Sequence, residues 1–224
     1  MELSAEAIRV LGSLMEKSRT TPESYPLTLN SLVLACNQKT SRDPVTDFDE
    51  DEVLAALDEL RELGLAVRVD MAGSRTAKYR ENIGEKWELS HADYALLAVL
   101  FLRGPQTPGQ LRQRTERLHS FAELHQVLDC LRRMMEREEE PHVLVQEAGR
   151  PSGSKEMRYA HTMCPIPEFV EEETTANASQ GPAVPGTRDR LNQVEERLVE
   201  VQEHLAEVQA RLAKLEEMLN DLNS

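Results

Sequence analysis

The feature that most constrains the fold is an internal repeat, because one order of expected elements occurs twice in the 224-residue chain. In the first copy, three segments have apolar residues at helical spacing: the first two begin at the favoured N-cap residues Ser4 and Thr28, and the third runs from about Asp49. A short β-hairpin is expected after Gly64, where the third helix stops. Three helices followed by a hairpin is the element order of a winged-helix domain, so residues 1–86 are predicted to form one.

Residues 87–164 repeat this order. Ser90 is expected to cap a first helix and Thr107 a second, while a capping box of Ser120 and Glu123 is expected to start a third. A second hairpin follows. A repeat near 80 residues indicates two copies of one domain rather than a solenoid. The predicted fold class is therefore mainly α with small β-hairpin wings, in the form of tandem winged helix-turn-helix domains.

The two expected third helices can be aligned locally, with Leu57 to Arg61 on Leu128 to Arg132. The apolar residues of the first are predicted to face inward: Val53, Leu54, Leu57 and Leu60. The same prediction for the second covers Phe121, Leu124, Val127, Leu128, Leu131 and Met134.

After Pro165 the composition changes. Residues 165–188 contain an acidic run, prolines and small polar residues, which predicts a disordered linker. Residues 189–224 predict a coiled-coil helix with an unbroken heptad seam: Leu191, Val194, Leu198, Val201, Leu205, Val208, Leu212, Leu215, Leu219 and Leu222. Parallel self-association is the favoured interpretation of this seam, and packing on the chain's own domains or on another protein is the alternative.

Composition limits the setting of the protein. No run approaches 18 apolar residues, so no membrane contact is expected, and the N-terminus lacks the pattern of a secretory signal. The three cysteines, Cys36, Cys130 and Cys164, are too far apart and too few for a disulfide framework. A cytoplasmic location is expected.

No catalytic motif is present. The sequence contains no glycine-rich phosphate loop, HExxH, paired CxxC or GxSxG. His161 and Cys164 offer only two metal ligands where a zinc site needs at least three. We therefore expect no enzyme activity, cofactor or metal.

Charge distinguishes the two copies as candidates for binding DNA. The net charge of the chain is −14, and residues 89–164 are neutral with ten basic and ten acidic residues. In the first copy, acidic residues crowd the start of helix three and its expected outward face, which consists of Glu52, Ala55, Ala56, Glu59 and Glu62. DNA would be repelled there, because phosphate contacts dominate DNA affinity.

The second copy has the better set of residues for phosphate and base contacts. The candidate DNA-binding residues lie on its helices and wing: Arg112, Arg114, Arg117, Gln126, Arg132, Arg133, Arg150, Lys155 and Arg158. A solvated face with internal salt bridges is the alternative interpretation of the same residues.

Four polar segments are distinctive: residues 37–45, 73–79, 102–107 and 155–161. They resemble the corresponding segments of the YceH family, a bacterial family of tandem winged-helix proteins. The resemblance covers about residues 3–164 and implies the tandem fold and a bacterial cytoplasmic setting. No catalytic residues are established for that family, so none are carried over.

Two functions fit the sequence. The first is a DNA-binding regulator oligomerised by its coiled coil, with double-stranded DNA as partner. The second is a non-enzymatic scaffold in which the winged helices dock another protein. A continuous basic stripe across helix three and the wing of the second copy would favour DNA, whereas a mixed surface with an exposed apolar patch would favour a protein partner.

Overall fold

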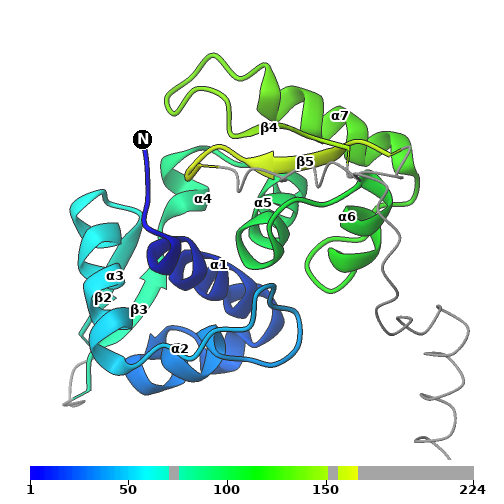
Figure 1. Ribbon diagram of the computed structural model, residues 1–224. Coiled ribbons are helices and arrows are strands. Elements are labelled where there is room, and N and C mark those ends of the chain that lie inside the picture. The colour runs from blue at the N-terminus through cyan, green and yellow to red at the C-terminus, as the bar shows by residue number, and fades with distance from the viewer. Residues whose placement is uncertain (71–75, 151–155, 166–224) are drawn as a thin grey trace, which may run out of the picture. The chain divides into compact units, whose positions relative to one another are not determined.

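The computed structural model describes residues 1–70, 76–150 and 156–165 (Figure 1). This part of the chain is mainly helical with two small antiparallel sheets, and it belongs to one compact unit that ends at Glu172. The predicted linker and heptad seam lie outside the described residues.

Within residues 1–70 and 76–86, the first half has four α-helices, a short 3₁₀ helix and three strands. They are α1 (Ala5–Thr20), η1 (Pro22–Ser24), β1 (Leu27–Thr28), α2 (Leu29–Cys36), α3 (Glu50–Glu62), β2 (Ala66–Val69), β3 (Lys78–Glu81) and α4 (Ile83–Lys86). The second half contains α5 (His91–Arg103), α6 (Pro108–Arg114), α7 (Leu124–Met135), β4 (Val145–Gly149) and β5 (Arg158–His161). The predicted order of three helices and a hairpin is therefore present twice, while β1 and α4 were not predicted.

The predicted N-caps Ser4, Thr28, Ser90 and Thr107 are all confirmed, and Asp49, near which the third helix was expected to begin, is also an N-cap. Each side chain accepts a hydrogen bond from a backbone N–H in the first turn of its helix. These bonds satisfy donors that the first turn leaves unpaired, which is why short polar residues fix where each helix begins.

The predicted capping box of Ser120 and Glu123 is wrong. Helix α7 begins at Leu124 with Glu123 as its N-cap, and the N–H of Glu123 donates to Gln126 Oε1 at 3.3 Å. The Ser120 hydroxyl donates instead to Glu116 at 2.9 Å. The spacing of Ser120 and Glu123 fits a capping box, but the Ser120 hydroxyl is instead bonded to a carboxylate that precedes it in the chain.

Strand pairing relates the two halves. The first sheet has the order β1-β3-β2, and Leu27 of β1 pairs with Tyr79 of β3. In the second half β4 pairs with β5, and Gln106 forms an isolated bridge with Tyr159 through backbone bonds of 3.0 and 2.8 Å. Leu27 and Gln106 each directly precede the threonine that caps the next helix, so the same pairing recurs at equivalent positions.

Burial shows that the aligned third helices are out of register by three residues. The buried positions of α3 are Val53, Ala56, Leu57 and Leu60, and those of α7 are Val127, Cys130, Leu131 and Met134. The two sets differ by a constant 74 positions, so Leu57 corresponds to Leu131 and not to Leu128. A shift of three residues nearly preserves a helix face, which explains why sequence similarity suggested the wrong register.

The predicted inward faces are consequently too wide. Leu54, Leu124 and Leu128 were expected inside but are 37%, 41% and 36% exposed, while Ala56 was expected outside and is buried. On both α3 and α7, the set of buried residues is therefore smaller than the set of apolar residues at helical spacing.

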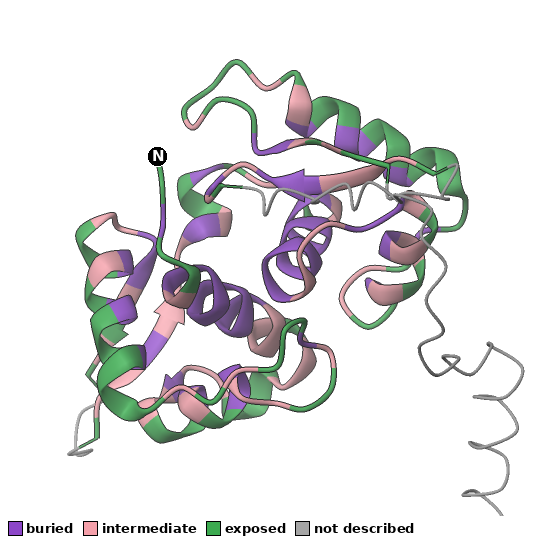
Figure 2. Cartoon of the chain, viewed as in Figure 1, coloured by how far each residue is buried: buried purple, intermediate pink, exposed green. Residues whose placement is uncertain are grey.

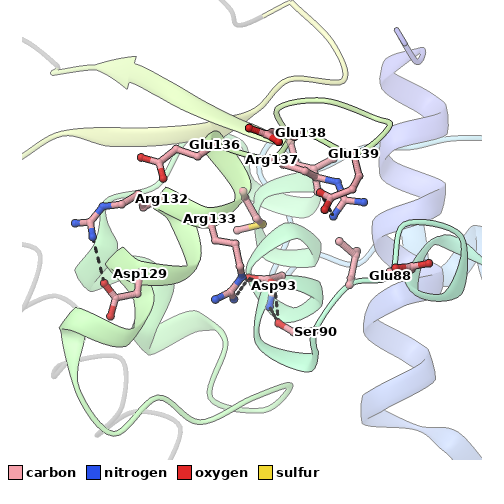
Figure 3. Close-up of a pocket in the computed structure, with 13 residues that line it drawn as sticks. Glu88, Ser90, Asp93, Asp129, Arg132, Arg133, Glu136, Arg137, Glu138 and Glu139 are labelled. Carbon is pink, nitrogen blue, oxygen red and sulfur yellow. Dashed lines mark hydrogen bonds and ion pairs between the residues drawn. The ribbon is translucent and has the colours of Figure 1, made fainter.

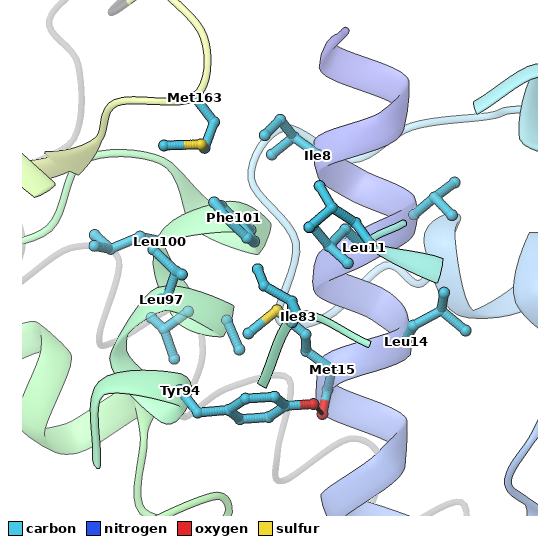
Figure 4. Packing of buried hydrophobic residues seen from close by; sticks show 14 of the residues in the cluster. Ile8, Leu11, Leu14, Met15, Ile83, Tyr94, Leu97, Leu100, Phe101 and Met163 are labelled. Atoms are coloured by element: carbon cyan, nitrogen blue, oxygen red, sulfur yellow. Dashed lines mark hydrogen bonds between the residues drawn. The ribbon is translucent and has the colours of Figure 1, made fainter. Parts of the chain in front are cut away.

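One core joins the two halves through α1 and α5 (Figure 4). Ile8, Leu11 and Met15 of α1 lie on the side that faces α5, and Leu97 and Phe101 lie among the α5 side chains of the same cluster. Helix α5 is buried from Asp93 to Leu102 (Figure 2), as expected for a helix that is apolar on all sides. The repeats therefore share a core.

No helix in the described ranges is both long and apolar enough to cross a membrane.

Candidate interaction face on helix α7

Helix α7 covers α5 and β4 with its buried stripe and exposes its opposite face. From the N-cap of this helix to two residues beyond its end, residues 123–137 carry three acidic and three basic side chains: Glu123, Asp129, Glu136, Arg132, Arg133 and Arg137. The face therefore has no net positive charge to attract DNA phosphates.

Arg133 is exposed, but its guanidinium is paired with a buried carboxylate of the protein. Its guanidinium contacts the Asp93 carboxylate at 2.6 and 3.2 Å, and the Ser90 hydroxyl donates to the same carboxylate at 2.6 Å (Figure 3). The Asp93 side chain is only 8% exposed, so it depends on Arg133 for a charged partner. The hydrogen bond to Asp93 raises the pKa of Arg133. Arg133 thus attaches α7 to the start of α5.

A pocket of about 690 Å³ lies beside this contact (Figure 3). Its charged lining is predominantly acidic: Glu88, Asp93, Asp129, Glu136, Glu138 and Glu139 against Arg132, Arg133 and Arg137. Arg132 lies 3.6 Å from Asp129, with both side chains exposed. This surplus of carboxylates makes the pocket unsuitable for phosphate groups.

Three further predicted DNA-binding residues, Arg112, Arg114 and Arg158, donate hydrogen bonds to other segments of the protein. Arg112 donates to the carbonyl of Phe121 at 3.1 Å and also to the Ala122 carbonyl. Arg114 donates to the side chain of Gln106.

Arg158 on β5 donates to the Pro105 carbonyl at 3.3 Å. The other predicted positions differ from these: Arg117, Gln126 and Arg150 are exposed, and Lys155 lies outside the described residues. Most of the predicted arginines therefore contact the protein itself.

Apolar side chains occupy the outer face of α7 where the prediction placed polar contacts. Leu124 and Leu128 are exposed and lie four residues apart, which places them on one helix face. Beside Leu128 is a pocket of about 420 Å³ whose apolar and aromatic lining includes Met135 and Tyr159. Arg132, Glu136 and Glu147 supply charge at the same pocket. In the sequence, this face could have been recognised from Leu124 and Leu128, which fall outside the helical spacing of the buried residues of α7.

His161 and Cys164 lie close together, as their spacing suggested. Cys164 Sγ is 3.9 Å from His161 Nε2, and burial lowers the pKa of His161 to about 4. Within the described ranges, no group of three histidine, cysteine or acidic side chains could hold a metal ion. This pair therefore lacks the further protein ligand that a zinc site requires.

Comparison with known proteins gives a family. A family model described as "Protein of unknown function, DUF480" matches residues 3–153, which include parts of both repeats. The chain belongs to this family. The chain is also similar to relatives named UPF0502 protein. The relative from Geobacter metallireducens is 49% identical over 174 residues, covering 78% of each chain. The relative from Solibacter usitatus is 43% identical over 195 residues, covering 87% of this chain and 90% of its own.

Proposed function

We propose that residues 1–86 and 87–164 are tandem winged-helix domains, and that the DUF480 family is the YceH family that the polar segments resemble. The repeated element order supports this proposal. So does the equivalent placement of two pairings, Leu27 with Tyr79 and Gln106 with Tyr159. In this arrangement α7 is the third helix of the second domain, and in related motifs that helix usually lies in the major groove of DNA.

We propose further that this protein is a non-enzymatic docking module and that the outer face of α7 binds a protein partner. The observation that carries the proposal is the exposure of Leu124 and Leu128 next to the pocket beside Tyr159. Fully burying an exposed leucine is worth about 1.5–3 kcal/mol, and Leu124 and Leu128 are 41% and 36% exposed, so covering both would contribute roughly 1–2 kcal/mol to binding.

The chemistry of the face defines the partner. An amphipathic helix fits best, with one large apolar side chain entering between Leu128 and Tyr159. Arg132 and Glu147 can pair with opposite charges on such a helix, which would fix its direction more than its affinity. The partner helix should therefore carry both an acidic and a basic residue beside its apolar anchor.

A DNA-binding regulator is the second candidate function. The observation in its favour is that Arg117 and Arg150 are exposed in the second repeat, as is Gln126 near the start of α7. The balanced charge of α7 weighs against it, since the attraction that brings a protein to DNA depends on a surplus of positive charge.

Self-association through residues 189–224 is a further part of the proposal. A parallel coiled coil joined by the linker 165–188 would present several α7 faces at once, and the resulting avidity would raise the affinity of each weak contact. The assembly is proposed to act in the bacterial cytoplasm.

The test uses full-length protein purified from its native host at native levels, followed by binding measurements with any co-purified protein in pure form. Leu128→Arg should weaken binding by at least about tenfold, because a charged side chain would fill the apolar contact. Leu54→Arg is the matched control, because Leu54 occupies the equivalent position on α3 with nearly the same exposure. Equal effects of the two substitutions, or no stable protein partner, would refute docking through α7.

A further inference from the structure

A second, smaller pocket of about 220 Å³ lies between the two repeats. It is lined by the end of α1, residues 38–41, the end of α5 and the segment from Arg114 to Leu118. Its charged residues are four cations and one carboxylate: Lys17, Arg103, Arg114, Arg117 and Glu16. Such a surplus of positive charge is unexpected in a chain of net charge −14.

The single carboxylate is already neutralised from within the protein. Glu16 accepts hydrogen bonds from Arg42 at 2.7 and 3.3 Å, and the Arg42 side chain has no exposed surface. Arg42 also donates to the Ala35 carbonyl at 2.8 and 3.0 Å. The buried Arg42 guanidinium pairs with Glu16, and Lys17 Nζ lies 3.5 Å from the same carboxylate. One carboxylate shared in this way leaves the positive charge of Arg103, Arg114 and Arg117 in excess.

Two of these cations have no partner in the described part of the chain. No hydrogen bond or ion pair involving residues 1–70, 76–150 or 156–165 holds the guanidinium of Arg103 or Arg117. Arg114 donates to the neutral side chain of Gln106, which supplies no counter-charge. Burial and the charges of Arg114 and Arg42 lower the pKa of Arg103. The pocket is therefore a site of like-charge repulsion that a bound anion would relieve.

We propose that this pocket binds a small phosphorylated ligand through Arg103, Arg114, Arg117 and Lys17. Guanidinium groups suit the task because their forked donors match phosphate oxygens, and Thr40 and Ser41 add hydroxyl groups to the lining. The volume lies below the range of about 300–1,000 Å³ that is usual for drug-sized ligands. The phosphate group is thus the bound part, and the remainder of a larger ligand extends into solvent.

Such a ligand would connect the repeats. Lys17 lies on α1 of the first repeat, whereas Arg103 and Arg117 belong to the second. The neighbouring backbone already links them, because the N–H of Asp43 donates to the Leu102 carbonyl at 2.9 Å. The site also gives a role to the polar segment at residues 37–45, of which Gln38, Thr40 and Ser41 line the pocket. This inference is independent of the α7 proposal.

Isothermal titration calorimetry of the full chain with inorganic phosphate and with pyrophosphate tests the site, in a phosphate-free buffer of low ionic strength. We expect binding of pyrophosphate with a dissociation constant below about 1 mM, and weaker binding of phosphate. The double variant Arg103→Gln/Arg117→Gln should weaken pyrophosphate binding by at least about tenfold.

Two further variants keep the test decisive if the double variant does not fold. Arg117→Gln alone changes an exposed residue and should still weaken binding several-fold, whereas Arg61→Gln removes an arginine on the surface of α3 and should leave binding unchanged. Equal binding by wild type and Arg117→Gln would overturn the proposal. So would equal affinity for sulfate and pyrophosphate, or binding of duplex DNA in the absence of any binding of the small anions.

Discussion

Gly12 of α1 lies so close to Phe101 of α5 that a methyl group on Gly12 would be 2.9 Å from Phe101 Cβ. The same methyl group would lie 3.0 Å from two side-chain carbons of Leu102. These separations are shorter than normal carbon contacts, and Phe101 Cβ cannot move without its backbone. The two repeats therefore share a core in which glycine is required where the helices approach each other.

Gly12→Ala should destabilise the protein although alanine is the better helix former. The propensity gain is about 1 kcal/mol, whereas overpacking a core costs about 1–3 kcal/mol. The difference is a net loss of up to about 2 kcal/mol, which urea denaturation measures. Gly109→Ala is the control, because its nearest neighbouring atom is 3.9 Å away. A gain in stability for Gly12→Ala would show that α1 and α5 are less tightly packed than described.

Acid stability should depend on Glu16. Burial by itself would raise the pKa of Glu16, but hydrogen bonds and charge from Arg42 outweigh it, and the pKa is lowered below 4.5. Because the folded state favours the ionised form, this contribution is complete above the unfolded pKa and is lost as the pH falls through the folded pKa.

The free energy of unfolding of wild type should therefore fall more steeply than that of Glu16→Gln between about pH 5 and pH 3. Glu62→Gln, at an exposed position, should show the same pH profile as wild type. Parallel acid profiles for wild type and Glu16→Gln would contradict the buried ion pair.

His161 should make stability pH-dependent in a different range. Burial lowers its pKa to about 4 from an ordinary value of 6.5, so the unfolded chain takes up a proton first as the pH falls. Stability is therefore lost progressively between pH 6.5 and about 4, by about 3 kcal/mol at most. An NMR titration should show the His161 ring protonating near pH 4, and His161→Phe should flatten this part of the profile. A midpoint near 6.5 would show that the ring is accessible to water.

Arg133 and Arg132 should differ in their effect on stability. Arg133→Gln leaves the buried Asp93 without its charged partner, for which we expect a loss of about 1–2 kcal/mol. Arg132 pairs with Asp129 at the surface, and Arg132→Gln should change stability by no more than about 0.5 kcal/mol. Chemical denaturation of the two variants measures this difference directly. Similar losses would mean that the contact between α7 and α5 does not depend on Asp93.

The sequence predicted those features of the fold that depend on neighbouring residues. The caps at Ser4, Thr28 and Thr107 could be recognised because a hydroxyl and the N–H it binds are three residues apart. Strand β1 has only two residues and owes its conformation to Tyr79, which is 52 positions from Leu27. No periodic pattern can develop over so short a segment.

The candidate site was harder to predict because it depends on which way side chains point. The exposure of Leu128 follows from the register of α7, and local similarity to α3 suggested a register three residues away. The partners of Arg112 and Arg133 are distant or lie on other elements, so the sequence alone presented them as free charges. The guanidinium of Arg103 has no hydrogen bond or ion pair within the described part of the chain, and Arg103 lines the pocket between the repeats.

The most direct test of docking through α7 is photo-crosslinking in living cells, with a photoreactive amino acid at position 128 of the full chain. We predict a discrete protein adduct that disappears when Leu124→Arg is added and that does not form when the photoreactive group is placed at position 54. Adducts to nucleic acid at position 128, or the same adducts at both positions, would contradict a protein-docking role for α7.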